Sequence, residues 1–509
     1  MKRTLLMLVL FCTTNSFCQI YEPDDSFGID GSIIHNDVSF YPTDALLVDN
    51  SYYFISDNNM VKLNYDGSLA TEFGNNGIIT LDNSAYNYTI SGFKHFESYF
   101  YVFGTRQDRE EGREDGFICK IDHTGNFDTS FGTNNFAIAN FEAQEIINDF
   151  VTDQNGNLFC IGTRYDGEVT NSIRLIYFKI DATGQLDATF DNNGFKEVAI
   201  NNFSNGSFIK TYGNNNFLLV GTDTYFEPIT NIRHQKLLTV LIDANGTPLN
   251  SYGTDGIRLT ELNTGMTNTL KNVDLINNSL YVNYFYSASV FDQGSRIAKY
   301  GIDEDQLAFN NVSYYNANFK VTNNGIFVTG AHACPSASDS SCPRDFNLSK
   351  MTEEGFADIT FNNNTEYTFD FPGDMYSDDV SQALITENDG TVLIGGHSTG
   401  IYWDTFYPSG FALIRLKPAT MDINTIKNKA LKLYPNPFTS TVTITSLSQS
   451  VISSVEVYDL TGRSIGKPAF YTHNGTTKVN LEMVQQKGSY VLKATSNDGS
   501  VFNNIIIKN

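Results

Sequence analysis

Short apolar runs recur along most of this chain, each bounded by glycine, asparagine or aspartate. The runs are rich in β-branched and aromatic residues and too short for helices, so they predict strands. Seven of them occupy comparable places in a repeating pattern: Tyr53–Ile55, Tyr99–Phe103, Leu158–Ile161, Phe217–Val220, Leu280–Val282, Ile326–Val328 and Val392–Ile394. Consecutive rather than alternating apolar positions are typical of strands covered on both faces. The pattern therefore predicts an all-β protein built from buried sheets.

A turn segment with an aromatic anchor repeats at intervals of 46 to 62 residues, and the anchors are Phe27, Phe73, Phe131, Phe190, Tyr252, Phe309 and Phe361. A unit of this length is typical of a propeller or a solenoid. One strand before each central run and one after each anchor, as at Ile78–Leu81, Phe136–Ala139 and Glu197–Ile200, bring each unit to four strands. Such units favour a seven-bladed β-propeller over residues 22–418.

The two ends of the repeat array complement each other. The array begins with a turn and a strand within Asp25–Asn36, and it ends near Pro418 on a third strand that no fourth strand follows. We predict that the N-terminal strand completes the last blade, because this closes the ring and removes an exposed sheet edge.

The segment Asp181–Gly194 reads Asp-Ala-Thr-Gly-Gln-Leu-Asp-Ala-Thr-Phe-Asp-Asn-Asn-Gly. It resembles the unit of the delta-60 repeat propellers, except that Asp191 replaces the glycine after the anchor. The Asn-Gly and Asp-Gly pairs of such turns accept a left-handed backbone, and the aromatic anchor is expected to plug the blade. Known members share no catalytic residue set, so the resemblance implies a fold and no particular reaction.

The N-terminus has the character of a secretory signal peptide. Met1-Lys2-Arg3 precedes an apolar stretch from Leu5 to Cys12, and we expect residues 1–18 to be removed near Cys18 or Gln19. The apolar stretch is too short to cross a bilayer, and the sequence predicts no membrane span elsewhere.

The C-terminal residues 431–509 follow a linker at 419–430 and carry 7 Lys+Arg against 4 Asp+Glu, whereas the whole chain has a net charge of −24. Their short alternating strands predict a small Ig-like β-sandwich. The opening Tyr434-Pro435-Asn436-Pro437 and the later Gly488-Ser489-Tyr490 resemble the type A C-terminal sorting domain of the type IX (Por) secretion system. This implies the secretion machinery as a partner and export through the periplasm to the outer-membrane surface or beyond. An accessory Ig-like module is the alternative.

The chain carries few signals of chemistry. A pI near 4.6 argues against nucleic acid as a partner. Phosphate-loop, zinc-protease and α/β-hydrolase motifs are absent, and the seven histidines are scattered. We predict no metal site and no cofactor. Acidic turns such as Asp187–Asn193 offer oxygen ligands for a structural calcium ion, but none has the full spaced loop, and turn formation alone explains them.

Four cysteines follow the signal segment. Cys334 and Cys342 bracket a Pro/Ser-rich loop on an oxidising export route, which predicts a local disulfide. Cys119 and Cys160 lie within apolar strands and are expected to be buried free thiols.

The connections after the central strands vary most between units, and in a propeller they emerge on one rim. Functional residues tend to lie on such loops. The candidate binding residues are Tyr402, Trp403, Asp404, Phe406 and Tyr407 in the last of these loops, together with Tyr225 and Phe226. A purely structural cap on the last blade is an equally good explanation of the aromatic cluster.

These features together predict a secreted or cell-surface β-propeller that is a non-catalytic binding protein, with a glycan or a peptide as ligand. The alternative is an extracellular glycan-active hydrolase or lyase that uses carboxylates on the propeller rim, and a structural surface component is a third. Two rim carboxylates within about 5 to 10 Å of each other, beside the aromatic residues, would favour a glycosidase.

Overall fold

The computed structural model describes residues 19–509 with the exception of 37, 39, 168–171, 192–193, 202, 214, 231, 263–265, 290–291, 303–306, 333–344, 363–365, 372–376, 403–404, 407–409, 420–430, 447–451, 460–462, 474–475 and 498–500. The described residues form 37 strands and no helix. None of them therefore builds a helix with the length and hydropathy needed to cross a membrane. The predicted signal peptide and most of the predicted linker lie outside the described residues. The chain divides into two compact units, Met1–Pro418 and Ala419–Asn509.

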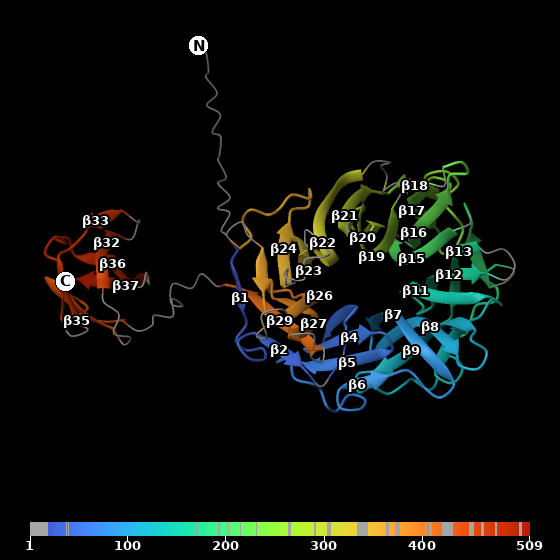
Figure 1. The fold of residues 1–509 in the computed structure, drawn as a ribbon, viewed down its shortest axis with the longest axis horizontal. Helices are drawn as coiled ribbons and strands as arrows, with labels where there is room; N and C mark the ends of the chain where they lie inside the picture. Colours follow the sequence, from blue (N-terminus) through green and yellow to red (C-terminus); the bar gives the residue numbers. More distant parts are fainter. Residues whose placement is uncertain are drawn as a thin grey trace, which may run out of the picture. The chain divides into compact units, whose positions relative to one another are not determined.

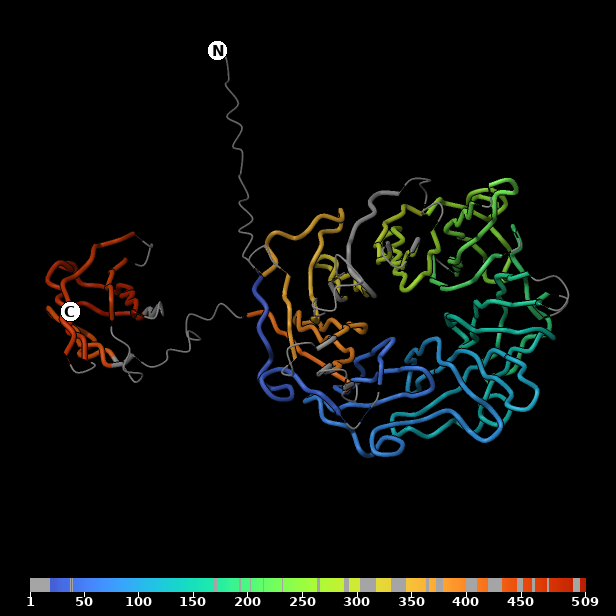
Figure 2. The backbone as a smooth tube through the Cα atoms, viewed as in Figure 1, coloured from blue at the N-terminus to red at the C-terminus, as the bar shows by residue number. Residues whose placement is uncertain are grey.

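The first unit is a ring of antiparallel sheets (Figures 1 and 2). The first two sheets of the ring are separate from each other and have four strands each. The first contains β3 (Asp44–Val48), β4 (Ser51–Ser56), β5 (Asn59–Asn64) and β6 (Ile78–Thr80), and the second contains β7 (Tyr86–Phe96), β8 (Tyr99–Asp108), β9 (Glu114–Asp122) and β10 (Phe136–Ala139). The strands of both sheets follow one another in sequence order, and β4 and β7 lie nearer the middle of the ring than β6 and β9 (Figure 1).

An eight-stranded sheet continues the ring. It consists of β11 (Gln144–Thr152), β12 (Leu158–Asp166), β13 (Ser172–Ile180), β14 (Phe195–Val198), β15 (Phe203–Tyr212), β16 (Asn216–Phe226), β17 (Arg233–Ile242) and β18 (Ile257–Glu261). A single parallel pair, Ile173 with Phe203, joins its two halves. Each half repeats the strand order of the first two sheets.

A seven-stranded sheet follows, with β19 (Thr267–Ile276), β20 (Ser279–Ser289), β21 (Asp292–Gly301), β22 (Leu307–Thr322), β23 (Gly325–His332), β24 (Phe346–Met351) and β25 (Tyr367–Phe369). The long strand β22 pairs with β21 through its first part and with β23 through its second part. One strand thus serves two consecutive units of the ring.

The last sheet of the ring joins the two ends of the first unit. It contains β26 (Ser377–Thr386), β27 (Val392–Tyr402), β28 (Thr405–Phe406) and β29 (Gly410–Pro418). The N-terminal strands β1 (Tyr21–Pro23) and β2 (Ser32–His35) pair with β29. Tyr21 pairs with Pro418, and Ile34 pairs with Ala412. Strand pairing between residues almost 400 positions apart closes the ring. The first unit is therefore an all-β, propeller-like fold.

Arg415 holds this closure together. Its side chain is only 1% exposed, contacts Asp24 at 2.7 Å, and donates hydrogen bonds to the Ser26 and Tyr52 hydroxyls. The Tyr52 hydroxyl in turn donates to Glu387 at 2.7 Å. A buried guanidinium is stable only when its donors are satisfied. The closing strands thus meet at a saturated charge network.

The repeated turn forms as the sequence predicts. Six anchors, Phe27, Phe73, Phe131, Phe190, Tyr252 and Phe361, are at most 7% exposed, while the side chain of Phe309 is not described. Asp181 accepts bonds from the backbone of Thr183 and Gln185, which fixes one such turn. Where other units place glycine, Asp191 adopts a left-handed backbone with φ of 76°.

One predicted strand is shifted. The expected segment Glu197–Ile200 is replaced by β14, which begins at Phe195 and ends at Val198. Phe195 pairs with Phe178 and Val198 pairs with Leu175, so β13 determines the register. Ile200 is 37% exposed and belongs to no strand, although it continues the apolar run.

The second unit consists of two four-stranded sheets. One contains β30 (Leu431–Tyr434), β31 (Thr441–Ser446), β35 (Thr476–Asn480) and β34 (Phe470–His473), and the other contains β33 (Ser464–Gly466), β32 (Ile452–Asp459), β36 (Gly488–Ser496) and β37 (Val501–Lys508). Val442 and Val479 of the first sheet share one buried core with Val457, Leu492 and Ile506 of the second. The two sheets therefore pack face to face.

Candidate functional site

The aromatic segment predicted to bind a ligand extends β27. Its backbone forms the short pair of β27 with β28, in which Ile401 faces Phe406 and Tyr402 faces Thr405. Trp403, Asp404 and Tyr407 lie outside the described residues, as do the side chains of Tyr402 and Phe406. The binding role of this segment stays a prediction.

Of the four cysteines after the signal segment, the structure describes two. Cys334 and Cys342 lie outside the described residues, so their disulfide stays a prediction. Cys119 and Cys160 are buried free thiols, as predicted. Burial raises the pKa of both thiols, which keeps them protonated and unreactive.

The other two predicted residues form part of an exposed apolar surface at the hairpin between β16 and β17. Tyr225 is 37% exposed and Phe226 44%, and Ile229 and Ile232 beside them are 96% and 42% exposed. The Tyr225 ring stacks on the His234 ring with centroids 4.7 Å apart and planes 10° apart. We refer to Tyr225, Phe226, Ile229 and Ile232 as the hairpin patch.

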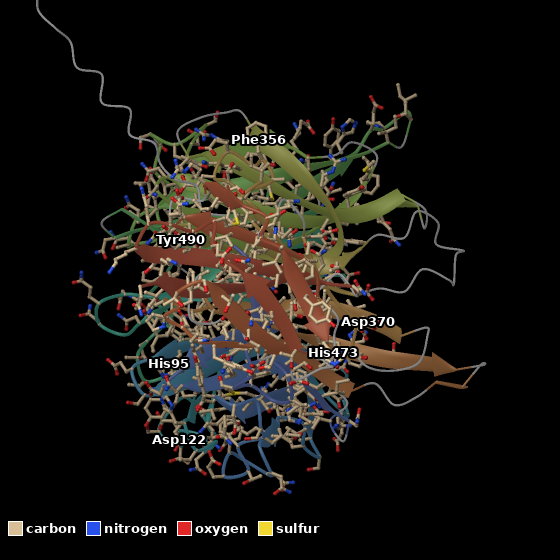
Figure 3. The ribbon with its side chains drawn as sticks, turned by 90° about the vertical axis from the view of Figure 1, so that its left-hand side faces the viewer. His95, Asp122, Phe356, Asp370, His473 and Tyr490 are labelled. Atoms are coloured by element: carbon tan, nitrogen blue, oxygen red, sulfur yellow. The ribbon has the colours of Figure 1, made fainter. Side chains whose placement is uncertain are left out.

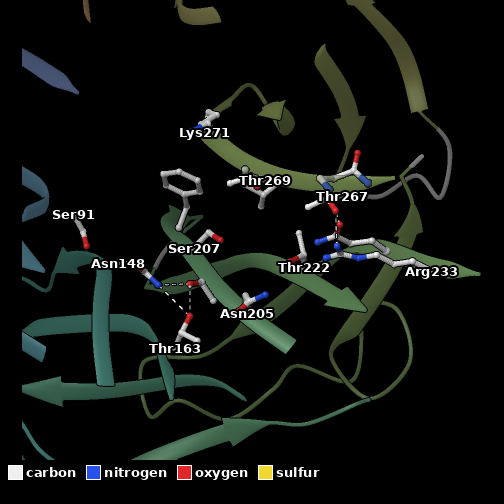
Figure 4. Close-up of a pocket in the computed structure, with 15 residues that line it drawn as sticks. Ser91, Asn148, Thr163, Asn205, Ser207, Thr222, Arg233, Thr267, Thr269 and Lys271 are labelled. Atoms are coloured by element: carbon white, nitrogen blue, oxygen red, sulfur yellow. Dashed lines mark hydrogen bonds between the residues drawn. The ribbon is translucent and has the colours of Figure 1, made fainter. Parts of the chain in front are cut away.

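A polar pocket of about 480 Å³ lies close to this hairpin (Figure 4). Its walls come from β7, β11, β15 and β19, the first strands of four consecutive units, with additions from β12, β16 and β17. The described lining residues are Ser91, Asn148, Thr163, Asn205, Gly206, Ser207, Phe208, Thr222, Arg233, Gln235, Thr267, Asn268, Thr269, Leu270 and Lys271. Its volume is within the range of small-molecule sites.

Hydrogen bonds between units hold the pocket walls in place. The Asn148 amide donates to the Gly206 carbonyl at 2.6 Å and to the Thr163 hydroxyl at 3.2 Å. On the opposite wall the Arg233 guanidinium donates to the Thr267 hydroxyl at 2.6 Å, and all three bonds are drawn in Figure 4. Because the bonds from Asn148 to Gly206 and from Arg233 to Thr267 join neighbouring units, the pocket is preformed by the scaffold.

The electrostatic character of the pocket differs from that of the whole chain. Its described lining includes the cations Arg233 and Lys271 and no carboxylate, although the chain has a net charge of −24. Burial lowers the pKa of Arg233, although the group remains cationic, and its Nε has no hydrogen-bond partner among the described residues. The pocket therefore offers a donor and positive charge to a ligand that carries acceptors.

The pocket and the hairpin patch adjoin each other. Phe226 of the patch and Arg233 of the pocket are directly paired across β16 and β17. A ligand that fills the pocket would reach exposed aromatic surface at its edge.

Two buried carboxylates occupy equivalent positions elsewhere in the ring. Glu145 on β11 and Asp379 on β26 both lie two residues before the irregular register step in the first strand of a unit, and both are 0% exposed. Arg164 stands directly opposite Glu145, and its Nε is 3.6 Å from Oε1. Burial raises the pKa of Glu145 to about 7, and the nearby Asp115 carboxylate acts in the same direction.

Asp379 is surrounded differently. Ser398 stands opposite it, and one carboxylate oxygen each from Asp345, Asp370 and Asp379 lie within 4.8 Å of one another. Burial raises the pKa of Asp379 to about 6, and the carboxylates of Asp370 and Asp345 contribute to this shift. Figure 3 places Asp370 on one side of the ring and His95 and Asp122 on the other. The cluster, which we call the acidic trio, was not predicted, because its members are joined only by strand register.

The sorting-motif residues connect the two sheets of the second unit. Asn436 donates to the Ile505 carbonyl at 2.8 Å and accepts from the Ile507 backbone at 2.7 Å. Tyr434 is 53% exposed, Pro435 and Pro437 follow cis peptide bonds, and Gly488 begins β36. The Tyr490 ring is buried, and its hydroxyl donates to the Gln486 carbonyl at 2.9 Å.

Residues 432–508 match the family described as secretion system C-terminal sorting domain. The domain interacts with the type IX secretion machinery, so the protein is exported to the cell surface or the extracellular space. No curated protein matches the chain.

Solved structures with a similar chain path are distant. Drosophila Semaphorin 2a is 7% identical with a TM-score of 0.43, covering 97% of this chain and 99% of its own. An endo-arabinase from Bacteroides thetaiotaomicron is 12% identical with a TM-score of 0.32 (52% and 95%), and the β-propeller domain of the Trilobed protease from Pyrococcus furiosus is 9% identical with a TM-score of 0.32 (71% and 90%). Likeness at this level indicates neither a substrate nor a reaction for this chain.

The pocket residues were missed by reasoning from sequence. Asn148, Arg233 and Lys271 are single polar residues in three different strands, with no motif around them. The one available signal was their position in first strands or beside a rim loop of a predicted propeller. Successive first strands also carry charges of alternating sign, at Lys94, Asp149 and Lys210. Sequence reasoning missed these charges for the same reason. The Lys94 ammonium and the Asp149 carboxylate are 2.5 Å apart.

Proposed function

We propose that this exported protein is a binding protein that binds an anionic glycan in the polar pocket of its ring. The observation that carries the proposal is the pocket lining, which combines Arg233 and Lys271 with neutral amides and hydroxyls and includes no carboxylate among its described residues. Arginine recognises carboxylate and sulfate groups through several donors at once, and amides and hydroxyls suit the hydroxyls of a sugar.

The hairpin patch supports a sugar ligand in particular. Phe226 presents exposed aromatic surface directly opposite Arg233, and the exposed Tyr225 ring stacks on His234, the neighbour of Arg233. An aromatic ring offers a flat apolar face to the C–H groups of a sugar while the pocket satisfies its polar groups. An acidic peptide would use the same charges, and the experiment below distinguishes the two ligands.

The finer architecture is part of the proposal. Seven four-stranded blades are supported by the two separate four-stranded sheets, by the two halves of the eight-stranded sheet and by the long strand β22 shared between two units. The buried anchors and the aspartate-capped turns favour the delta-60 repeat as the origin of these blades. For the second unit, the corresponding proposal is an Ig-like sandwich that is a type A sorting domain.

A glycan-active enzyme is the second candidate, and the acidic trio is the observation that favours it. Its carboxylate oxygens converge within 4.8 Å, which is close to the spacing of a retaining glycosidase. However, Asp379 is 0% exposed, so it cannot reach a glycosidic bond in a bound polysaccharide. Binding without catalysis is therefore the better supported function.

An array of anionic glycans, neutral glycans and acidic peptides, probed with the purified full-length protein, tests the proposal. We expect capture of uronic-acid or sulfated glycans, and we expect Arg233→Met and Lys271→Ala each to weaken it at least tenfold. Lys478→Ala removes an exposed lysine from the second unit and serves as the control. Capture of acidic peptides alone, or release of sugars that Asp379→Asn abolishes, would overturn the proposal.

A further inference from the structure

The acidic trio comes from positions at or near the ends of three strands, which belong to two neighbouring units. Asp345 directly precedes β24 and Asp370 directly follows β25, and the pairing of Phe346 with Phe369 places these two aspartates side by side. Asp379 comes from β26, the first strand of the next unit. The trio therefore spans a junction between consecutive sheets.

Asp379 is the unusual member of the trio. Its side chain is 0% exposed, and its Oδ2 accepts a bond from the Phe371 backbone at 3.1 Å. Its Oδ1 is buried and has no hydrogen-bond partner among the described residues. A buried carboxylate is costly without a cation, and Ser398, whose hydroxyl hydrogen-bonds to this carboxylate, supplies no positive charge.

The equivalent junction shows what such a partner does. At Glu145 the chain supplies a cation itself, because Arg164 stands directly opposite. At Asp379 the residue in that place is Ser398, and two further carboxylates lie within 4.8 Å instead. The junction at Asp379 thus gathers negative charge, as a cation site does, where the junction at Glu145 has an arginine.

We propose that Asp345, Asp370 and Asp379 bind a calcium ion that joins two neighbouring units of the ring. Oxygens on a calcium ion lie about 2.3–2.6 Å from it, so they are at most about 5 Å from each other, which agrees with the 4.8 Å limit of the trio. Calcium suits this site better than magnesium, because it accepts irregular sets of carboxylates without near-ideal octahedral geometry. Extracellular calcium modules bind with Kd values of about 10⁻⁴–10⁻³ M, and we expect this range here.

The proposal does not depend on the pocket, and it assigns the ion a structural role. An ion bound only by the folded ring stabilises it by RT ln(1 + c/Kd), where c is the calcium concentration, so stability rises with the calcium concentration. Without the ion, the buried Asp379 carboxylate lies beside two other carboxylates, so we expect removal of the ion to lower the stability of the ring.

Calcium titration of the chelator-treated full-length protein, by calorimetry and by thermal unfolding, tests this site. We expect one site per chain and a rise in unfolding temperature in millimolar Ca²⁺, with a smaller rise in Mg²⁺. Asp379→Asn should abolish the response. Asp370→Asn changes an exposed side chain, is expected to fold normally, and should weaken binding at least tenfold.

The matched control is Glu145→Gln, which makes the same kind of change at the equivalent junction and should keep the full calcium response. The proposal is overturned if 10 mM Ca²⁺ produces neither heat nor a shift in unfolding temperature. It is equally overturned if Asp370→Asn and Asp379→Asn respond to Ca²⁺ as the unmodified protein does.

Discussion

Glu145 and Asp379 occupy the same position in two units of one ring, and they differ in what lies across from them. Glu145 faces Arg164, whereas Asp379 faces Ser398 and approaches Asp345 and Asp370. Both carboxylates are fully buried, so each needs positive charge or a proton. The comparison shows that a repeated scaffold places an arginine against the buried carboxylate at one junction and two further carboxylates at another, where the proposed calcium ion would supply the positive charge.

The largest effect is expected from the substitution Arg164→Ser, which places a serine opposite Glu145 as Ser398 stands opposite Asp379. Glu145 would remain buried without its cation, and breaking such a pair costs about 3 kcal/mol. Urea unfolding at pH 8 measures the loss. Arg463→Ser removes an exposed arginine of the second unit that pairs with Asp459, and this control should change stability by less than about 1 kcal/mol. An Arg164→Ser protein as stable as this control would show that the pair contributes nothing.

The pH dependence of stability sharpens the comparison. The pKa of Glu145 is about 7 in the folded state, above its usual value of 4.5, so the folded protein binds the proton more tightly than the unfolded chain. The resulting stabilisation is complete below pH 4.5 and is lost as the pH rises through 7. Between pH 5 and 8 we expect a fall of about 2 kcal/mol from this group.

The groups that face Glu145 are Arg164 from β12, Asp115 from β9, and Asp166 and Glu197, which share Arg164 with it. Urea midpoints of the unmodified protein and of Glu145→Gln, measured across this pH range, isolate its contribution. Parallel pH profiles for the two proteins would show that Glu145 does not titrate in this window.

The substitution Ser398→Arg makes the reverse exchange and has a smaller expected effect. An arginine opposite Asp379 would supply the cation that Arg164 supplies to Glu145, so stability in chelator should rise by about 1–2 kcal/mol. The response to calcium should shrink at the same time. Thr399→Arg is the control, because adjacent residues of a strand point to opposite faces. Equal behaviour of the two variants would contradict the equivalence of the junctions.

The fold was largely predictable because its information is local and repeated. Six buried anchors and several aspartate-capped turns, as at Asp122, Asp181 and Asp243, recur among the described residues, and strands that are apolar on both faces indicate sheets covered on both sides. The start of β14 was misplaced, because its register follows from pairing with β13 rather than from the apolar run that ends at Ile200.

The candidate site was much less predictable. Asp345, Asp370 and Asp379 meet through the register of three strands, and Arg233 reaches the pocket through its pairing opposite Phe226. Such proximity depends on tertiary pairing and leaves no spacing signature in a single sequence. Sequence reasoning placed Tyr225 and Phe226 in a loop after a central strand, whereas they end β16 and are exposed there, and their binding role stays a prediction.

The most direct test of the proposed function is calorimetric titration of the full-length protein with a uronic-acid oligosaccharide and with its methyl ester. The two ligands share one backbone and differ only in the charge that Arg233 and Lys271 would recognise. We predict binding of the acid that weakens with added salt and is lost in Arg233→Met, and binding of the ester at least tenfold weaker. Equal affinity for acid and ester, or unchanged affinity in Arg233→Met, would contradict the account of the pocket as an anion-selective glycan site.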